Sequence, residues 1–509
     1  MTGAAVPVPS SSPYITAEIQ RVWPDHGRRM PARSLGLAAA AGLAAAAVLP
    51  SAPVGIGLFV VGMLIAAAAL PTALPRLGVH EIAYGVLATL LLSVVVLRDA
   101  DWLVALCLLG TVAAASYALI GGRTTVGVVL AAMSLPMAGL RALAWIGRGV
   151  SARLPRERGT WGPRLRTVTT SVVLLVVFGA LFASADAVFA SLLPSLDLAD
   201  LPLRAVVFIV FTGLALSAAF LGAAPPRWDV LSPGPARAVR AIEWIVPITG
   251  VVALFAVFVG VQVSVLLGGD DYVLRTAGLT YAEHARSGFG QLVVVTLLTL
   301  AVVAAAGRWA PRETPGQRLV LRLLLGALCL LALAVVVFAL NRLHLYEDAF
   351  GFTRLRLFMN VFEGWLGLLL VLVLLAGVRL RAPWLPAAIV VTAASALLGL
   401  AAINPDGFVA DRNVDRFTAT GKLDVAYLRV LSADAVPAID RLPEPVRSCA
   451  LSGIRVSETR RTDDGWAGWN LGRAQATDIL AAASTPATAE CTGLLGVAGT
   501  PRTSSGPGH

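Results

Sequence analysis

The sequence predicts an all-α membrane protein, a polytopic bundle of about twelve transmembrane helices (eleven to thirteen) with a small, mostly helical, extracytoplasmic C-terminal region. Two observations predict this fold class. Of the 509 residues, 57% are hydrophobic and only 14% are charged, and the mean hydropathy is +0.79. Apolar runs of roughly 20 residues recur through the first 402 positions without the period-two alternation of a membrane barrel. Composition therefore excludes an ordinary soluble protein.

Residues 1–33 are rich in Pro, Ser and Arg and lack the apolar core and cleavage site of a signal peptide, which predicts a disordered tail. The transmembrane domain is predicted over residues 34–402. Its expected spans lie near residues 35–50, 54–73, 80–97, 102–120, 124–145, 169–190, 203–222, 242–266, 289–307, 319–340, 358–377 and 384–402. The first run is short and only Pro50–Pro53 separate it from the second, so a re-entrant hairpin would give the same pattern.

Two further segments follow the last span. Residues 403–443 place apolar and charged positions at helical spacing with breaks at Gly421 and Pro437, which predicts two or three short membrane-proximal helices. Residues 444–509 form a C-terminal tail with one helical stretch, Trp466–Ala483, and a Thr-, Gly- and Pro-rich end that is predicted to be disordered.

The arginines predict an orientation. Sixteen lie in or beside the loops at 146–168, 223–241, 308–318 and 378–383, whereas the alternating loops carry six. The positive-inside rule places the first set in the cytoplasm and the C-terminal region outside. Twelve spans would also export the N-terminal tail with its four arginines, so we expect a miscount of one, most readily within the first 75 residues.

Charge also limits the partners. The net charge of +10 comes from the first 402 residues, where arginines flank the spans, so we expect lipid headgroups and reject nucleic acid. Lys422 is the single lysine, which excludes lysine chemistry from the membrane part. No cofactor is predicted.

Four cysteines complete the composition. Cys107 and Cys329 lie in mid-span, where a thiol is ordinarily a small hydrophobe. Cys449 and Cys491 flank the helical part of the tail and would form a disulfide in an oxidising exterior; two unpaired thiols are the alternative.

Several motifs occur together in the second half of the chain. They are Thr280–His284 followed by Gly288–Leu292, Arg342–Arg356, Asn404–Asp406, Arg412–Arg416, Gly421–Leu428 and Leu431–Pro437. In the sequence and order of these motifs, the chain resembles bacterial membrane proteins of the domain-of-unknown-function families forty-one fifty-three and forty-one seventy-three. The resemblance covers about residues 100–480 and implies a multi-span protein of the bacterial cell membrane, with no activity to carry over.

One span carries a polar stripe. Arg356, Asn360, Glu363 and Gly367 fall at i, i+4, i+7 and i+11, so they share one helical face. Charges within a span are costly and usually paired, which predicts a buried cluster of Arg356, Asn360 and Glu363 with Asp186 of another span as partner. A structural salt bridge that fixes helix packing is the alternative to a transport site.

The loops predicted to be external offer a second cluster, formed by Glu283, His284, His344, Glu347 and Asp348. Two His and a carboxylate could bind zinc, but the spacing matches no metal motif and neighbouring arginines favour ion pairs, so no metal is predicted.

The sequence lacks the common nucleotide, dinucleotide, zinc-protease and serine-hydrolase motifs. We therefore favour a non-enzymatic envelope sensor, or an accessory subunit bound to another membrane protein. The alternatives are a secondary transporter that uses Asp186 and Glu363, and a membrane-embedded transferase on a lipid-linked substrate with Glu283, Glu347 or Asp348 as base.

Overall fold

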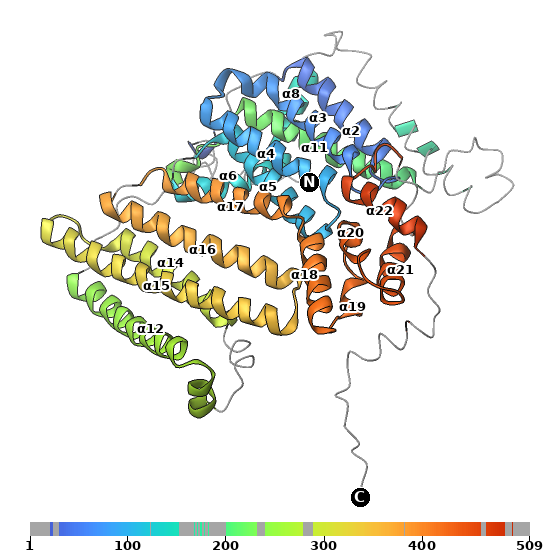
Figure 1. Cartoon of the computed structure of the whole chain (residues 1–509). Helices are drawn as coiled ribbons and strands as arrows, with labels where there is room; N and C mark the ends of the chain where they lie inside the picture. Colours follow the sequence, from blue (N-terminus) through green and yellow to red (C-terminus); the bar gives the residue numbers. More distant parts are fainter. Residues whose placement is uncertain are drawn as a thin grey trace, which may run out of the picture.

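The computed structural model shows an all-α membrane protein with several helices long and apolar enough to cross a bilayer (Figure 1). It describes residues 21–23, 30–122, 124–151, 200–231, 240–277, 289–380, 382–459, 465–483 and 491, with isolated positions between 167 and 182. No strand occurs among these residues. Nine of the helices in these ranges meet the length and hydropathy of a membrane span, and the shorter apolar helix Ala32–Val48 lies beside them.

Two groups of long helices form the bundle, and α17 joins them by packing on α4 and α5. The first group contains α2 (Ala32–Val48), α3 (Ile56–Ala73), α4 (Val79–Leu97), α5 (Asp101–Ile120) and α11 (Leu201–Ala223). The second contains α12 (Ala241–Ala277), α14 (Phe289–Trp309), α15 (Pro315–Phe350), α16 (Arg354–Arg379) and α17 (Leu385–Ala402).

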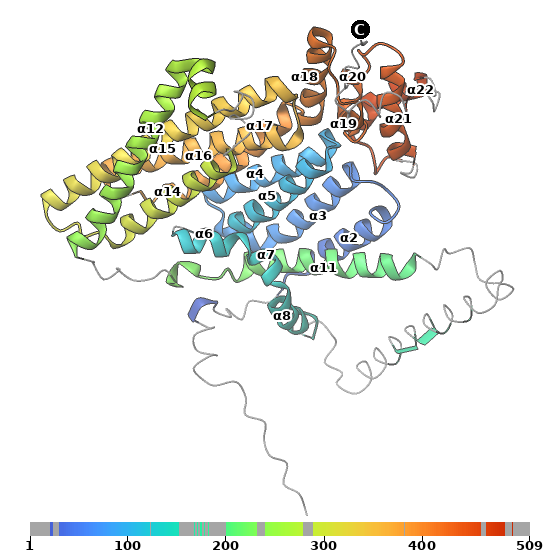
Figure 2. The ribbon, with the colours of Figure 1, turned by 90° about the horizontal axis from the view of Figure 1, so that it is seen from below.

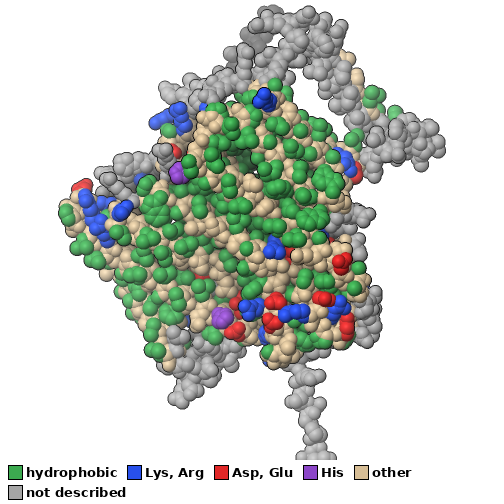
Figure 3. Space-filling view, turned by 45° about the horizontal axis from the view of Figure 1, so that its top comes forward, with side chains coloured by type: hydrophobic (Ala, Val, Ile, Leu, Met, Phe, Trp, Pro, Cys, Tyr) green, Lys and Arg blue, Asp and Glu red, His purple; other side chains and the backbone are tan. Residues whose placement is uncertain are grey.

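The outer surface of this bundle is apolar. Large side chains such as Leu254, Val257 and Leu323 are each more than 60% exposed. Figure 3 shows apolar side chains over the broad face of the helices and charged side chains gathered toward its margins. Because water does not tolerate so large an apolar surface, the bundle is embedded in lipid.

The C-terminal segment, described over residues 403–459 and 465–483, gathers at one end of the bundle (Figure 2). Its elements are α18 (Pro405–Thr420), α19 (Val425–Leu428), η3 (Ala433–Ala435), α20 (Val436–Ile439), α21 (Val446–Thr459) and α22 (Leu471–Ala482). We call this end of the bundle the docked end. It holds the α4–α5 turn at 98–100, the α15–α16 turn at 351–353 and the end of α17, because residues of the C-terminal segment bond or adjoin each of them.

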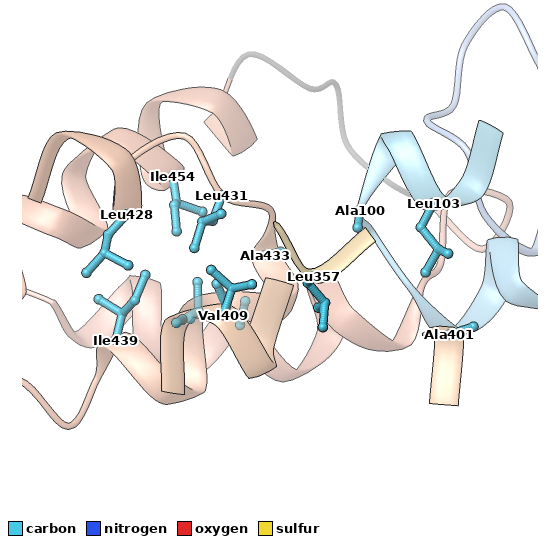
Figure 4. Packing of buried hydrophobic residues seen from close by; sticks show 14 of the residues in the cluster. Ala100, Leu103, Leu357, Ala401, Val409, Leu428, Leu431, Ala433, Ile439 and Ile454 are labelled. Atoms are coloured by element: carbon cyan, nitrogen blue, oxygen red, sulfur yellow. The ribbon is translucent and has the colours of Figure 1, made fainter. Parts of the chain in front are cut away.

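An apolar cluster continues from the C-terminal segment into the bundle. Val409, Leu428 and Ile439 are fully buried and belong to the same cluster as Leu103 of α5 and Leu357 of α16. Figure 4 shows the cluster running from Leu428 and Ile439, past Val409 and Leu357, to Leu103. Continuous burial of this kind makes the C-terminal segment part of the folded core.

The opposite end holds the described arginines of the loops predicted to be cytoplasmic, such as Arg227, Arg312 and Arg318, and we call it the arginine-rich end. It contains the turn after α5, where Thr124 bonds Asp229 of η2 (Trp228–Leu231), and the α14–α15 turn, where Arg312 donates to Leu380 O. Trp23 is also buried there and donates to Ala224 O at 2.8 Å. Part of the predicted disordered tail is therefore packed, at the same end as the arginine-rich loops.

The structure differs from the predicted span at 124–145. It contains three short helices, α6 (Thr125–Ala132), α7 (Ser134–Met137) and α8 (Gly139–Ser151), and even the longest reaches only about 20 Å. The break has a local cause. Pro136 has no backbone N–H to donate within a helix, and the Ser134 hydroxyl accepts a hydrogen bond from Trp228 Nε1. Of the twelve predicted spans, this one is therefore absent as a single helix, and most of the predicted span at 169–190 lies outside the described residues. The run at 35–50 in the first 75 residues, where we expected the miscount, forms the helix Ala32–Val48.

Candidate functional site

A cavity of about 510 Å³ lies at the docked end, between the end of α15, the start of α16 and α18. Its wall combines acidic, basic and aromatic side chains. They are His344, Glu347, Asp348, Phe352, Leu357, Asn360, Phe408, Arg412, Asp415 and Arg416. The membrane bundle and the C-terminal segment each supply part of this wall, so the cavity exists only while the two are docked.

The turn between α15 and α16 shapes the cavity. Gly351 has a φ of +85°, a conformation that favours glycine, and a Cβ there would lie 2.6 Å from Asn413 Oδ1. Asn413 accepts from Phe352 N at 3.1 Å and donates to Phe352 O at 2.8 Å. This paired hydrogen bond fixes the turn against α18 and holds the aromatic ring of Phe352 in the wall.

The cavity has a buried acid and an exposed rim. Glu347 is only 2% exposed, and its carboxylate accepts from Asn360 Nδ2 at 2.7 Å. At the rim, His344 Nε2 lies 3.8 Å from Asp348 Oδ2, and both side chains are exposed. Arg416 donates to Ala349 O at 2.7 Å, which ties α18 to the end of α15.

Arg412 is a second arginine of the cavity wall, beside Arg416. It is exposed, and its guanidinium stacks over the Phe408 ring at 5.1 Å. The wall can therefore contact an anionic group through the arginines and a cationic group through the carboxylates.

A buried ion-pair network docks the C-terminal segment on the α4–α5 turn. Arg473 of α22 pairs with Asp99 of the α4–α5 turn at 2.5 Å, and their side chains are 6% and 3% exposed. In return, Asp99 N and Ala100 N donate to Asp434 Oδ2 at 2.7 and 3.1 Å. Asn470 donates to Val95 O and Arg98 O, both at 2.9 Å, so the end of α4 is capped by the segment.

Two buried aspartates of the segment, Asp406 and Asp434, have pKa values shifted in opposite directions. Burial and the neighbouring Asp99 charge raise the pKa of Asp434 to about 6. Burial also acts on Asp406, but its hydrogen bonds with Arg354 and the Arg354 charge outweigh it and hold the pKa of that carboxyl below its usual range. Asp406 is thus a stable anion, whereas Asp434 titrates within the range of mildly acidic surroundings.

The predicted intramembrane cluster is not brought together. Arg356 donates to Gly351 O and stacks over the Tyr346 ring at 4.1 Å, whereas Asn360 bonds Glu347. The reason is axial distance, because residues seven apart share a face but lie about 10 Å apart along the helix. The predicted partner Asp186 lies outside the described residues.

Glu363 lies deeper in the bundle. It is fully buried and accepts from Thr296 Oγ1 of α14 at 3.3 Å, and its other carboxylate oxygen has no hydrogen-bond partner among the residues that the structure describes. The structure does not bring it to Arg356.

Three members of the predicted external cluster, His344, Glu347 and Asp348, line the cavity, and Asn360 joins them from the other predicted cluster. Glu283 and His284 lie outside the described residues. Within the described ranges, no group of three or more His, Cys, Asp or Glu side chains is arranged to hold a metal ion.

Cys449 and Cys491 have their sulfurs in bonding contact, with Cα atoms 5.5 Å apart. Cys491 thereby lies against α21, a helix that the sequence analysis did not predict.

Sequence reasoning missed the residues that dock the C-terminal segment, Asp99, Asp434 and Arg473. Asp99 and Asp434 each lie in a short polar stretch between apolar runs. The hydrogen bond between them joins residues 335 positions apart, so no local sequence pattern could predict it. It also missed Arg412 and Arg416, which lie in a motif quoted above but were not assigned to the cavity.

A fold of membrane helices with a cavity at one end defines a polytopic membrane protein without naming its activity. A family model described as "Domain of unknown function (DUF4153)" matches residues 86–442, more than half of the chain, and the chain belongs to this family. No curated protein and no solved structure matches it.

Proposed function

We propose that this protein is a non-enzymatic envelope sensor or accessory subunit of the cell membrane, whose docked end faces the exterior. The orientation rests on the excess of arginines at the other end and on the packing of Trp23 there. With eleven spans, both the N-terminal segment and the arginine-rich loops are cytoplasmic, which removes the conflict that twelve spans create.

The cavity at the docked end is the observation that carries the proposal. Its volume of about 510 Å³ falls in the usual range for small-molecule sites. Glu347 and Asp348 suit a cationic group and Arg412 an anionic one, while Phe352 and Phe408 offer apolar contact. This combination favours a small zwitterion, such as an amino acid or a short peptide, over a purely apolar ligand.

Signalling would come from the shared wall. A ligand that bridges α15–α16 and α18 binds only the docked arrangement, so it stabilises that arrangement by its differential affinity. A partner protein that reads the position of the C-terminal segment would then respond to the ligand.

The test uses the full chain purified in mild detergent. A panel of amino acids and dipeptides is screened by thermal unfolding, and copurified compounds and proteins are identified by mass spectrometry. We expect a zwitterionic compound to raise the melting temperature, and Glu347→Gln and Arg412→Gln each to weaken its binding about tenfold or more, as loss of a charge-assisted hydrogen bond does.

Glu313→Gln is the matched control, because Glu313 is an exposed acid at the arginine-rich end. The proposal fails if no member of the panel shifts unfolding, or if all three variants bind equally. A product mass formed from a bound compound would instead favour the transferase alternative, with Glu347 or Asp348 as base.

Glu363 favours the secondary transporter as a second candidate. It lies about 14 Å along α16 from its first residue, near the bilayer centre, and one carboxylate oxygen has no hydrogen-bond partner in the described part of the chain. Proton-coupled uptake into vesicles that Glu363→Gln abolishes, with folding unchanged, would support transport. Equal uptake by the variant and the parent would reject this role for Glu363.

A further inference from the structure

A second cavity of about 510 Å³ lies at the arginine-rich end, far from the proposed ligand cavity. Arg76 and Arg227 line it together with Ile120, Gly121, Pro226 and Asp229. The cavity belongs to none of the functions considered above.

The balance of charge in this cavity is basic. Asp229 is the one acidic residue among the described lining residues, and its Oδ1 accepts from N and Oγ1 of Thr124, the N-cap of α6, at 3.0 and 2.7 Å. Arg227 is held by its backbone, which donates to Val22 O at 2.7 Å, while its side chain is exposed. Arg76 Nη1 lies 3.4 Å from Gly222 O, so the backbone of α11 orients that guanidinium.

The position of the cavity fixes its surroundings. It lies where α5 ends at Ile120, just beyond the end of α11 at Ala223, and beside η1 (Leu74–Arg76), which continues α3. Because three membrane helices end there, the cavity is at the level of the lipid headgroups. Ile120 and Pro226 provide apolar wall next to the arginines.

We infer that this cavity binds the phosphate of an anionic phospholipid in the leaflet at the arginine-rich end. Guanidinium groups bind phosphate oxygens with paired, charge-assisted hydrogen bonds, and basic pockets at the ends of membrane helices hold anionic headgroups. Free phosphate shares this chemistry, but the apolar wall and the depth at the bilayer surface favour the lipid.

The test titrates phosphatidylglycerol, phosphatidylcholine or inorganic phosphate into the full chain in detergent and measures bound lipid by native mass spectrometry and the shift in thermal unfolding. Phosphatidylglycerol should bind more tightly than phosphatidylcholine. Arg227→Gln should weaken phosphatidylglycerol binding about fivefold or more, as expected for one interfacial arginine. Arg227→Lys, which keeps the charge, should recover part of the loss.

Arg379→Gln is the control, since Arg379 is an exposed arginine at the same end but outside the cavity. Equal affinity for the two lipids, or equal losses in Arg227→Gln and Arg379→Gln, would overturn the site. Stabilisation by inorganic phosphate that depends on Arg227, with no preference for phosphatidylglycerol, would overturn the lipid as its occupant.

Discussion

Replacing Arg473 with Leu should release the C-terminal segment from the bundle. The change leaves Asp99, which is 3% exposed, without its cation, and it removes the donor to Val54 O at 3.0 Å. Removing one partner of a buried ion pair costs about 3–5 kcal/mol because the remaining charge is uncompensated. The equilibrium for undocking should therefore rise by about two to three and a half orders of magnitude.

The assay is limited proteolysis of the full chain in detergent, with the rate of cleavage within the C-terminal segment followed against urea concentration. The double variant Asp99→Asn with Arg473→Leu should recover much of the loss, since neither charge of the buried ion pair is then left without the other. Arg441→Leu is the control, because its ion pairs with Asp411 and Asp415 are about half exposed and contribute about 0–1 kcal/mol. Equal cleavage of Arg473→Leu and Arg441→Leu would refute the reasoning.

Three further predictions concern Asp434, the pair Arg356 and Glu363, and the pair Cys449 and Cys491. The pKa of Asp434 is raised from 3.8 to about 6, so its protonated form stabilises docking below pH 4. That contribution, at most about 3 kcal/mol, is lost as the pH rises through 6. Asp434→Asn should flatten the pH dependence of cleavage over this range. A double-mutant cycle of Arg356→Leu and Glu363→Gln should give a coupling within about 0.5 kcal/mol of zero, and thermal unfolding that shows strong rescue would contradict the separate partners described above. Cys449 and Cys491 should be recovered as a disulfide by non-reducing mass spectrometry of native membranes, and a closed loop of this size stabilises by about 3–4 kcal/mol in the chain-entropy model; two free thiols would exclude it.

Hydropathy predicts where most helices cross the membrane. The runs at 54–73, 80–97 and 384–402 agree within two residues with α3, α4 and α17. Sustained apolar composition is a local property, and lipid selects it directly. The same measure misjudged 124–145, because Pro136 and the bond from Trp228 to Ser134 break a run that remains apolar.

Hydropathy also fails to predict the part of a helix that continues beyond the apolar run. The predicted span at 319–340 ends ten residues before α15 does, and the remaining turns carry His344 and Glu347 to the cavity. The local sequence pattern therefore identified part of the site, but predicted that these residues lie in an external loop rather than on a helix. The wall that α18 supplies depends on contacts across some 60 residues, such as that of Asn413 with Phe352, which no spacing rule contains.

The proposed function depends most directly on the side of the membrane that the docked end faces. A cysteine at Ala419, exposed on α18, and one at Glu313, exposed at the arginine-rich end, can be labelled in intact cells with a membrane-impermeant maleimide. We predict that Ala419→Cys is labelled without permeabilisation and that Glu313→Cys is labelled only after it. Labelling of Glu313→Cys alone in intact cells would place the cavity in the cytoplasm and contradict the proposed function.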